Sequence, residues 1–414
     1  MPSAAASPDA RLDALTAWAG AAMDTSEFAL APASADASFR RYFRIMPVAP
    51  WRGHATIVAM DAPPPKEDCR PFVHVARLLA AAGVHAPAVL ADDLARGFLL
   101  LSDLGDRTYL AALDAASAPK LYADATDALI RWQTATRDGE LPPYDDALLS
   151  RELALFPDWF VARHLSRQLD AAQSATLARA FRLILDNNLA QPRVYVHRDY
   201  HARNLMVADP NPGVLDFQDA VVGPVTYDLV SLLRDAYIAW DEEQQLDWAV
   251  RYWERARKAG LPVGADFGTF WRDFEWMGVQ RQLKVLGIFA RLKYRDGKQG
   301  YLEDTPRFLG YVRGVAKRYR ELMPLVPLLD QGRVYVFASK GGAPTNPDWY
   351  HNLVARPEVT VELGAGTFSA TATPVSGAER DRVYAIQAQR YPGFAEYEAK
   401  TTRVIPVVEL VRAS

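Results

Sequence analysis

The chain has 414 residues, 50% of them hydrophobic, and a formal net charge of −3 at pH 7. This length allows a two-lobed enzyme with a further segment, and the near-neutral charge lacks the basic footprint of nucleic-acid-binding proteins. The single cysteine, Cys69, excludes an intrachain disulfide framework. Residues 1–10 lack the pattern of a signal peptide, and no apolar run reaches the length of a membrane span. We therefore expect a cytoplasmic protein that binds neither nucleic acid nor membrane.

The first hundred residues predict a small lobe rich in β-structure. Residues 11–23 place apolar side chains on one side of a helix, and residues 39–46 alternate as a half-buried strand does. The prolines at 63–65 end the β-meander that these strands begin. In chain order we expect a helix at 11–23, strands at 28–31, 39–46 and 56–60, a helix at 68–82, and strands at 89–90 and 98–101.

A helical pattern follows from residue 108 and is interrupted once. Short apolar runs at 194–196, 205–207 and 214–215 are separated by polar loops, and 209–213 is a strong turn signal. We expect these runs to form short strands that place the polar loops at the end of a small sheet. Further helices are expected at 227–237, 242–258, 267–293 and 305–322.

The composition changes again near residues 324–332, where two prolines and a glycine separate helical from strand-like sequence. Runs typical of strands follow at 334–338, 359–363 and 404–410. We therefore expect an α+β chain in three parts. They are an N-terminal lobe at 1–104, a mostly helical lobe at 105–327 and a sheet segment at 328–414.

Three polar residues around the short strands have the chemistry of a phosphoryl-transfer site. Asp199 follows the apolar run 194–196, and its carboxylate would accept the proton of an attacking hydroxyl group. Asn204 offers a side-chain carbonyl five residues later, and Asp216 follows the next hairpin. Hard oxygen ligands in this small number suit Mg²⁺, which completes its coordination with water and nucleotide phosphates. The alternative is an ordinary hairpin whose loops contain an Asp and an Asn.

The loop at 197–204, followed by Asp216 in Asp-Phe-Gln, is similar to the catalytic loop and metal-binding Asp-Phe-Gly of kinases. The chain resembles the aminoglycoside phosphotransferase-like, or choline kinase-like, superfamily, and within it the bacterial cell-wall amino-sugar kinases. The resemblance implies a protein-kinase-like two-lobed fold and ATP with Mg²⁺ as cofactors. It also implies an amino-sugar substrate, the anomeric hydroxyl group of N-acetylmuramate or N-acetylglucosamine, in cell-wall recycling. The segments that carry the resemblance are 38–44, 60–64, 101–106, 197–204, 213–235 and 280–291.

The same resemblance implies a nucleotide site between the two lobes. Ser38 and Arg41 would contact the phosphates, and Asp103 and Leu104 would form the hinge whose backbone groups bind adenine. At Ser38, a plain hairpin turn is the alternative. The chain departs from the superfamily on the third strand, because residues 58–60 lack the usual lysine. Arginines of the second strand would then compensate.

The resemblance also suggests residues for the acceptor and for support of the loop. The expected substrate-binding residues are His201, Arg203, Asp219, Glu275 and Lys284. Arg203 suits a carboxylate such as a lactyl group. Glu275 and Lys284 fall on a long helix with aromatic neighbours, a pattern that is also typical of a packed helix. His197 and Asp228 are expected to support the catalytic loop structurally rather than to react.

Residues 332–412 resemble a different family, the deazaflavin-dependent nitroreductases, which have a split β-barrel fold. The segments that carry this resemblance are 338–344, 347–353, 391–397 and 403–407. That family has further strands before this point, whereas here the preceding sequence is helical, so we expect a partial barrel. A partial barrel leaves an open sheet edge, which invites pairing with another chain. We therefore expect the segment to be a dimerisation patch for a homodimer, a remnant or a fusion artefact, in preference to a working redox unit.

These patterns leave three functions open. The first is an ATP-dependent phosphotransferase for an amino sugar or, alternatively, for an aminoglycoside or another small molecule. The second is a deazaflavin-dependent oxidoreductase that uses the C-terminal segment. The third is a pseudokinase that acts as a binding module. The missing third-strand lysine favours the third function, whereas the presence of Asp199, Asn204 and Asp216 argues against it.

Overall fold

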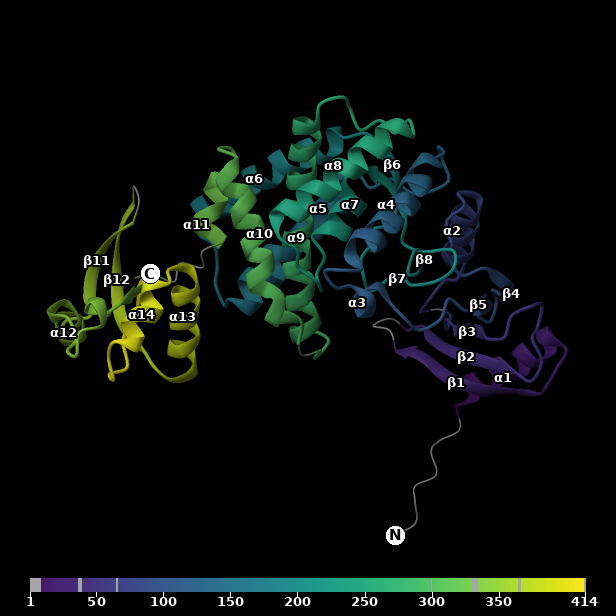
Figure 1. The fold of residues 1–414 in the computed structure, drawn as a ribbon, viewed down its shortest axis with the longest axis horizontal. Helices are drawn as coiled ribbons and strands as arrows, with labels where there is room; N and C mark the ends of the chain where they lie inside the picture. Colours follow the sequence, from purple (N-terminus) through teal and green to yellow (C-terminus); the bar gives the residue numbers. More distant parts are fainter. Residues whose placement is uncertain are drawn as a thin grey trace, which may run out of the picture. The chain divides into compact units, whose positions relative to one another are not determined.

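The computed structural model describes residues 9–35, 39–64, 66–298, 300–329, 334–363 and 366–412 (Figure 1). The chain divides into two compact units, residues 1–318 and 319–414. The boundary that composition places between 327 and 328 stays a prediction. Within the described ranges, no helix combines the length and the apolar character that a bilayer crossing requires.

The first unit begins with a five-stranded antiparallel sheet in the order β1-β2-β3-β5-β4. Its strands are β1 (Phe28–Ala35), β2 (Arg41–Pro47), β3 (Ile57–Asp61), β4 (Val89–Asp93) and β5 (Phe98–Ser102). β-branched and aromatic side chains on β2, β3 and β5 fit a pleated, half-buried surface. The strands expected at 28–31, 39–46, 56–60, 89–90 and 98–101 are confirmed.

Two helices accompany this sheet, and both are the ones that the sequence predicts. In α1 (Ala10–Met23), the buried residues Leu15, Ala19 and Met23 recur at each helical turn. They share one apolar cluster with side chains of β2, β3 and β5, so α1 covers one face of the sheet. Helix α2 (Arg70–Ala81) lies between β3 and β4 in the chain.

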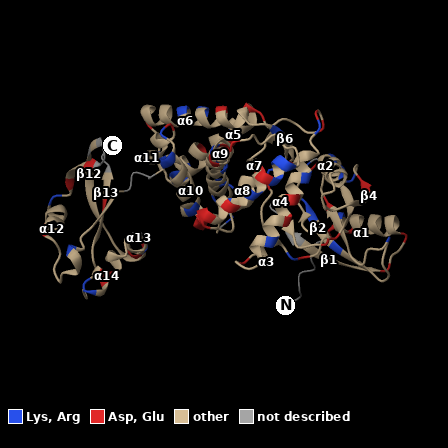
Figure 2. Cartoon of the chain, turned by 45° about the horizontal axis from the view of Figure 1, so that its top comes forward, with Lys and Arg blue, Asp and Glu red and all other residues tan. Residues whose placement is uncertain are grey.

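The rest of the first unit is mostly helical, with α9 packed among the other helices (Figure 1). Its helices are α3 (Tyr109–Ala112), α4 (Ala118–Thr134), α5 (Asp146–Leu155), the π-helix η1 (Phe156–His164), α6 (Ala171–Ala190), α7 (Tyr227–Leu233), α8 (Glu242–Lys258), α9 (Phe267–Tyr294), η2 (Tyr301–Asp304) and α10 (Thr305–Arg318). Helix α9 contacts α5, η1, α6, α7, α8 and α10. A Cβ atom on Gly287 would lie 2.4 Å from the backbone carbonyl carbon of Leu155, so α9 meets the end of α5 backbone to backbone. Figure 2 shows Lys and Arg interspersed with Asp and Glu along these helices.

Two short hairpins interrupt the helices. Strand β6 (Arg193–Val196) pairs with β9 (Val221–Pro224), and β7 (Leu205–Met206) pairs with β8 (Gly213–Val214). The three runs expected as strands are confirmed, whereas β9 was not expected because it ends in Gly-Pro, a turn signal. Since β8 folds back on β7, the residues just before β7 and just after β8 come together.

The second unit contains a four-stranded antiparallel sheet in the order β10-β13-β12-β11. Its elements are η3 (Met323–Leu325), α11 (Val326–Leu329), β10 (Val334–Phe337), η4 (Lys340–Gly342), α12 (Asp348–Ala355), β11 (Glu358–Leu363), β12 (Gly366–Val375), α13 (Gly377–Arg390), α14 (Gly393–Ala399) and β13 (Val407–Arg412). One apolar cluster joins the sheet to α12, and a second joins it to α13 and α14. Among the described residues, β10 and β11 are edge strands with no further partner strand.

Candidate active site

A cleft of about 930 Å³ in the first unit is lined by both lobes. Its walls come from β2, β3, the segment after β5, the loops around β7 and β8, and α9. Asp199, Asn204 and Asp216 all line this cleft. The structure therefore places the three residues of the expected phosphoryl-transfer site at one surface.

The β7–β8 hairpin brings these three residues into direct contact. Asn204 lies just before β7, and its Nδ2 donates to the backbone carbonyl of Asp199 at 3.0 Å. The same Nδ2 lies 3.3 Å from Oδ2 of Asp216, two residues after β8. Since Asn204 Nδ2 serves both neighbours, its Oδ1 is left to accept or to coordinate.

Asp228, in the first turn of α7, holds the catalytic loop by its backbone. Its two carboxylate oxygens accept from the N–H of His197 at 2.6 Å and from the N–H of Arg198 at 3.0 Å. Arg198 has φ of 78°, a left-handed conformation that costs energy for a residue with a side chain. Burial raises the pKa of Asp228 to about 7, although the two N–H bonds oppose this shift. These two bonds are compatible with the supporting role that the sequence suggests for Asp228.

His197 joins the catalytic loop to the end of the hairpin. Its Nδ1 accepts from the N–H of Asp199 at 3.2 Å, so Nε2 carries the proton and donates to the carbonyl of Leu215 at 3.0 Å. Burial lowers the pKa of His197 to about 4, which keeps the imidazole neutral. The side chain therefore fixes the position of Asp199 without titrating at neutral pH.

Asp235 is a second support that sequence reasoning missed. Its fully buried carboxylate accepts from the N–H of Ala202 at 2.8 Å and from the N–H of Tyr237 at 2.9 Å. It lies just beyond α7, so one short helix positions both supporting carboxylates. Its sequence signal is only an Asp after a buried apolar run, which does not distinguish it from other acidic residues.

The charges around Asp199 favour its ionised form. Burial alone would raise the pKa of Asp199, but nearby basic groups, of which Lys284 contributes most, outweigh burial and lower it. An ionised Asp199 carboxylate at the cleft can accept a hydrogen bond from a hydroxyl group and then accept its proton.

Asn204 and Asp216 fit a divalent cation that is shared with a phosphate ligand. The carboxylate of Asp216 is oriented by Gln218, whose Nε2 lies 2.9 Å from Oδ1. Among the described residues, no group of three or more His, Cys, Asp and Glu residues could hold a metal ion by itself. Two hard oxygen donors at a cleft suit Mg²⁺, which takes its remaining ligands from water and nucleotide phosphates.

The sequence profile of the "Phosphotransferase enzyme family" matches residues 29–267, which is more than half of the chain. The chain belongs to the phosphotransferase enzyme family. An N-acetylmuramate/N-acetylglucosamine kinase from Pseudomonas putida is 51% identical over 332 residues, which cover 78% of this chain and 96% of that protein. The expected resemblance to amino-sugar kinases is thus confirmed.

The fold agrees with this family. A choline/ethanolamine kinase family protein from Mesorhizobium loti superposes with a TM-score of 0.51 at 16% identity, over 77% of this chain and 99% of that chain. The expected α+β, kinase-like architecture of a β-rich lobe and a helical lobe is confirmed.

The C-terminal part of this phosphotransferase is similar to a second family. The profile of "F420H(2)-dependent quinone reductase" matches residues 291–411, beginning within α9. A reductase of that description from Mycobacterium tuberculosis is 36% identical over 113 residues, 26% of this chain and 74% of that protein. The resemblance of the C-terminal segment to deazaflavin-dependent enzymes is confirmed.

The segment after β5, which the resemblance assigns to the hinge, is held by an ion pair across the sheet. Arg44 Nε lies 2.6 Å from Oδ2 of Asp103, and Arg44 Nη2 lies 3.0 Å from Oδ1. Oδ1 of Asp103 also accepts from the N–H of Gly105 at 2.9 Å. Burial opposes the ionised form of Asp103, but the bond to Arg44 lowers its pKa below the usual value. Asp103 and Leu104 both line the cleft, and their role as the hinge that binds adenine stays a prediction.

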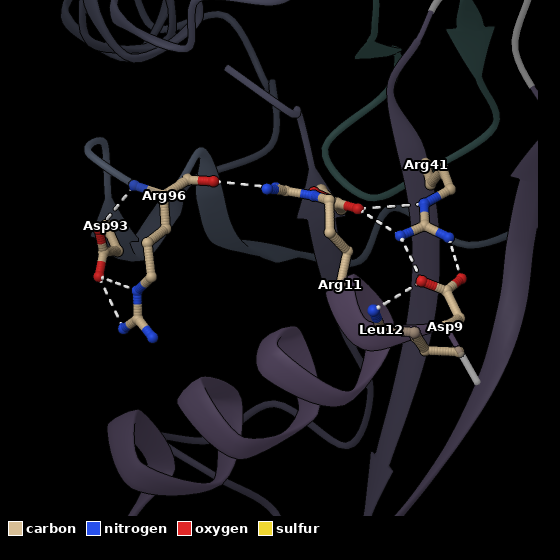
Figure 3. Close-up of polar contacts among 7 residues, drawn as sticks. Asp9, Arg11, Leu12, Arg41, Asp93 and Arg96 are labelled. Atoms are coloured by element: carbon tan, nitrogen blue, oxygen red, sulfur yellow. Dashed lines mark hydrogen bonds and ion pairs between the residues drawn. The ribbon is translucent and has the colours of Figure 1, made fainter. Parts of the chain in front are cut away.

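The surroundings of Arg41 differ from those expected for a residue that binds phosphate (Figure 3). Its Nη2 lies 2.6 Å from Oδ2 of Asp61, and its Nη1 contacts Asp9. Arg11 binds the same Asp61 carboxylate. Because side chains alternate along a strand, Tyr42 and Arg44 face the cleft, whereas Arg41 does not line it. Ser38 lies outside the described residues.

One part of the cleft contains two of the expected substrate-binding residues. His201 and Arg203 line it, and both contact Tyr237. The His201 ring lies edge-on to the Tyr237 ring at 5.5 Å, and the Arg203 guanidinium lies 4.8 Å from that ring. The buried Nδ1 of His201 has no hydrogen-bond partner among the described residues, so it is free to meet a ligand.

Three expected substrate residues are not brought to the cleft wall. Lys284 is buried, with Nζ 2.8 Å from Oε1 of Glu152 and 3.0 Å from the Tyr227 hydroxyl. Glu275 is buried beside Arg234 and pairs with an arginine of α10. Asp219 is exposed, and its carboxylate lies 3.4 Å from Nε2 of Gln218. The packed-helix alternative for Glu275 and Lys284 describes these positions better than sugar contact does.

Proposed function

We propose that this phosphotransferase transfers the γ-phosphoryl group of ATP to the anomeric hydroxyl group of N-acetylmuramate or N-acetylglucosamine. The observation that carries the proposal is the meeting of Asp199, Asn204 and Asp216 at one cleft. The choice of acceptor is supported by the relative that is 51% identical and is an N-acetylmuramate/N-acetylglucosamine kinase. Such a reaction would return cell-wall sugars to precursor synthesis.

In the proposed reaction, Asp199 receives the proton of the acceptor. The acceptor oxygen attacks the γ-phosphorus, the bond from that phosphorus to the bridging oxygen breaks, and the electron pair leaves with ADP. The hydroxyl proton passes to the Asp199 carboxylate and later to water. The lowered pKa of Asp199, to which Lys284, His201 and Arg281 contribute against burial, keeps this carboxylate available.

Asn204 Oδ1 and the Asp216 carboxylate would hold Mg²⁺. When bound, Mg²⁺ neutralises charge on the nucleotide phosphates and orients them. The protein contributes to Mg²⁺ binding by holding the Asn204 and Asp216 side chains in fixed positions. Asn204 is tied to the carbonyl of Asp199, and Asp216 is tied to Gln218.

His201, Arg203 and Tyr237 would bind the sugar. The Tyr237 ring offers an apolar surface for a sugar face, and the unpartnered Nδ1 of His201 can bond to a hydroxyl or acetamido group. The exposed guanidinium of Arg203 can form a bidentate pair with a carboxylate. A lactyl carboxylate is present in N-acetylmuramate and absent from N-acetylglucosamine, so Arg203 would act on only one of the two sugars.

Transfer from radiolabelled ATP tests the proposal. We expect label on both amino sugars, none on kanamycin or gentamicin, and a loss of at least about 100-fold in kcat for Asp199→Asn. Asn keeps the size of the side chain, so the melting temperature should stay close to that of the wild type. Wild-type turnover by the Asp199→Asn protein would remove Asp199 as the base. Transfer to the aminoglycosides alone would replace the substrate class.

A second candidate function rests on the C-terminal unit. Its identity of 36% to an F420H(2)-dependent quinone reductase favours binding of the reduced deazaflavin coenzyme. The match covers 74% of that protein. Titration of the full chain with the coenzyme, followed by coenzyme fluorescence, tests this function. A flat titration at micromolar coenzyme would exclude it.

The homodimer expected from the sequence is also proposed. Edge strands β10 and β11 offer unpaired backbone N–H and C=O groups within the described residues. Light scattering coupled to gel filtration gives the mass directly. A chain of 46.0 kDa that elutes as a monomer at micromolar concentration would contradict the dimer.

A further inference from the structure

The cleft contains few cations that could meet phosphate groups. Besides His201, its described lining residues include four basic side chains, Arg44, Arg203, Arg281 and Lys298. The third strand carries none, since Val58 occupies the part of β3 that lines the cleft. A kinase that uses ATP needs positive charge near the transferred phosphoryl group. We therefore expect one of these four residues to provide that charge.

Two of the four cations have partners that assign them to other tasks, and the third lies outside the helices. Arg44 forms the two-bond ion pair with Asp103 in the hinge. Arg203 is exposed and stacks on Tyr237 at the acceptor side. Lys298 follows the end of α9.

Arg281, on α9, differs from these three in burial and in bonding. It is 3% exposed, and its Nη1 is a buried donor without a hydrogen-bond partner among the described residues. The neighbouring buried cation Lys284 has the Glu152 carboxylate 2.8 Å away, whereas no described ion pair involves Arg281. A buried charge without a paired anion is costly, so an anion that arrives with a ligand would satisfy this position.

The position of Arg281 on α9 points to the reacting end of the cleft. Arg281 lines the cleft together with Val285, Ile288, Phe289 and Leu292, which recur at helical spacing along one face of α9. The other four are apolar, so Arg281 is the only basic residue of this described wall. Asp199 lines the same cleft, and the charge of Arg281 acts to lower the pKa of both Asp199 and Asp228, as expected for a position near the catalytic loop.

We propose that Arg281 binds the oxygens of the phosphoryl group during its transfer from ATP to the acceptor, and supplies the charge that the third strand lacks. This inference rests on the proposed phosphoryl transfer. Arg281 makes and breaks no covalent bond and keeps its protons; its N–H groups donate to the non-bridging oxygens. A guanidinium fixed before the reaction stabilises the charge of the transition state without reorganisation.

The test compares Arg281→Met and Arg281→Lys with the matched control Arg291→Met. Arg291 lies on the same helix, is partly buried and has an unpaired Nε, but it does not line the cleft. We expect Arg281→Met to lower kcat by at least about 100-fold for both amino sugars and to change their KM values less than threefold. Arg281→Lys should keep part of kcat, and Arg291→Met should match the wild type.

A second measurement does not depend on the sugar. ADP with aluminium fluoride mimics the nucleotide with a planar phosphoryl group, and its affinity relative to ADP alone reports binding of that group. We expect Arg281→Met to lose at least tenfold in this ratio while ADP affinity is unchanged. Should Arg281→Met fail to fold, as judged by thermal melting, Arg281→Lys provides the same ratio.

Two outcomes would overturn the inference. One is an unchanged aluminium fluoride ratio in the folded Arg281 variants. The other is a rise in KM for N-acetylmuramate alone, which would assign Arg281 to the substrate carboxylate. A wild-type protein that binds ADP with aluminium fluoride but phosphorylates neither sugar would refute the proposed acceptor, and the ratio would still decide the role of Arg281.

Discussion

The backbone N–H of His197 donates to the carboxylate of Asp228 at 2.6 Å, and these two buried residues titrate in opposite senses. Burial raises the pKa of Asp228 from 3.8 to about 7, and burial lowers the pKa of His197 from 6.5 to about 4. The folded protein therefore favours protonated Asp228, and this stabilisation is lost as pH rises from 3.8 through 7. It also favours neutral His197, and that stabilisation is lost as pH falls from 6.5 through 4.

Single substitutions should separate these two opposed effects. Relative to the wild type, His197→Gln removes the His197 contribution, so its free energy of unfolding should gain less, or lose more, as pH rises from 4 to 6.5. Asp228→Asn removes the Asp228 contribution, so relative to the wild type its free energy of unfolding should gain more, or lose less, as pH rises from 4 to 7. Each difference from the wild type integrates to a few kcal/mol at most, at about 1.4 kcal/mol per pKa unit. Urea unfolding at several pH values measures both slopes, and equal slopes in the two variants would contradict this account.

Gln218 should tune the affinity for Mg²⁺ without touching the metal. Its Nε2 lies 2.9 Å from Oδ1 of Asp216 and orients that carboxylate. We expect Gln218→Ala to raise the Mg²⁺ concentration for half-maximal activity by about tenfold, with kcat at saturating Mg²⁺ reduced less. Gln168→Ala changes an exposed glutamine and serves as the control. A Mg²⁺ dependence equal to that of the control would show that Asp216 does not need this bond.

Glu152 connects two cations below the catalytic loop. Its Oε1 lies 2.8 Å from Arg198 Nη2 and 2.8 Å from Lys284 Nζ. Glu152→Gln leaves both cations without their carboxylate, and we expect a loss of about 3–5 kcal/mol in the free energy of unfolding. Lys284→Met in the Glu152→Gln background should cost less than it does in the wild type, because the ion pair is already lost. Chemical denaturation of the four proteins of this cycle gives the coupling energy, and additive effects would argue against a shared network.

Gly287 should be the least replaceable glycine of α9. A methyl group there would lie 2.4 Å from the backbone carbonyl carbon of Leu155, and backbone atoms cannot rotate away. We expect Gly287→Ala to lower the free energy of unfolding by about 1–3 kcal/mol or more. Gly314→Ala in α10 is the matched control, since its Cβ would meet no atom within 4 Å and should stabilise the helix by about 1 kcal/mol. Equal melting temperatures for the two variants would contradict the close approach of α9 to α5.

Much of the catalytic loop could be predicted because its contacts are local. Asn204 follows Asp199 by five residues, and a strong turn signal between β7 and β8 returns the chain to Asp216. A hairpin of this length allows few other arrangements, so spacing alone indicates that the three side chains meet.

Other predictions depended on contacts that no local pattern contains. Arg41 and Arg44 both lie on β2, and only the pairing of the sheet shows which of them faces the cleft. Lys284 and Arg281 are three residues apart on α9, but Lys284 turns to Glu152 on α5, whereas Arg281 lines the cleft. A difference of one position along a strand, or of a few positions around a helix, decides whether a charged side chain contacts a buried partner or faces the cleft.

The amino-acid sequence by itself determined the two lobes, the loop that carries Asp199 and Asn204, and the return of Asp216, because hydrophobic periodicity and turn chemistry act over a few residues. Only the tertiary structure determined which charged side chains pair with one another and which remain available to bind a ligand. Asp61 forms ion pairs with Arg11 and Arg41, and Glu152 forms ion pairs with Arg198 and Lys284. Arg281 Nη1, in contrast, has no hydrogen-bond partner among the described residues. The physical reason is that a buried charge selects its partner by distance in space, over separations along the chain that no sequence period records.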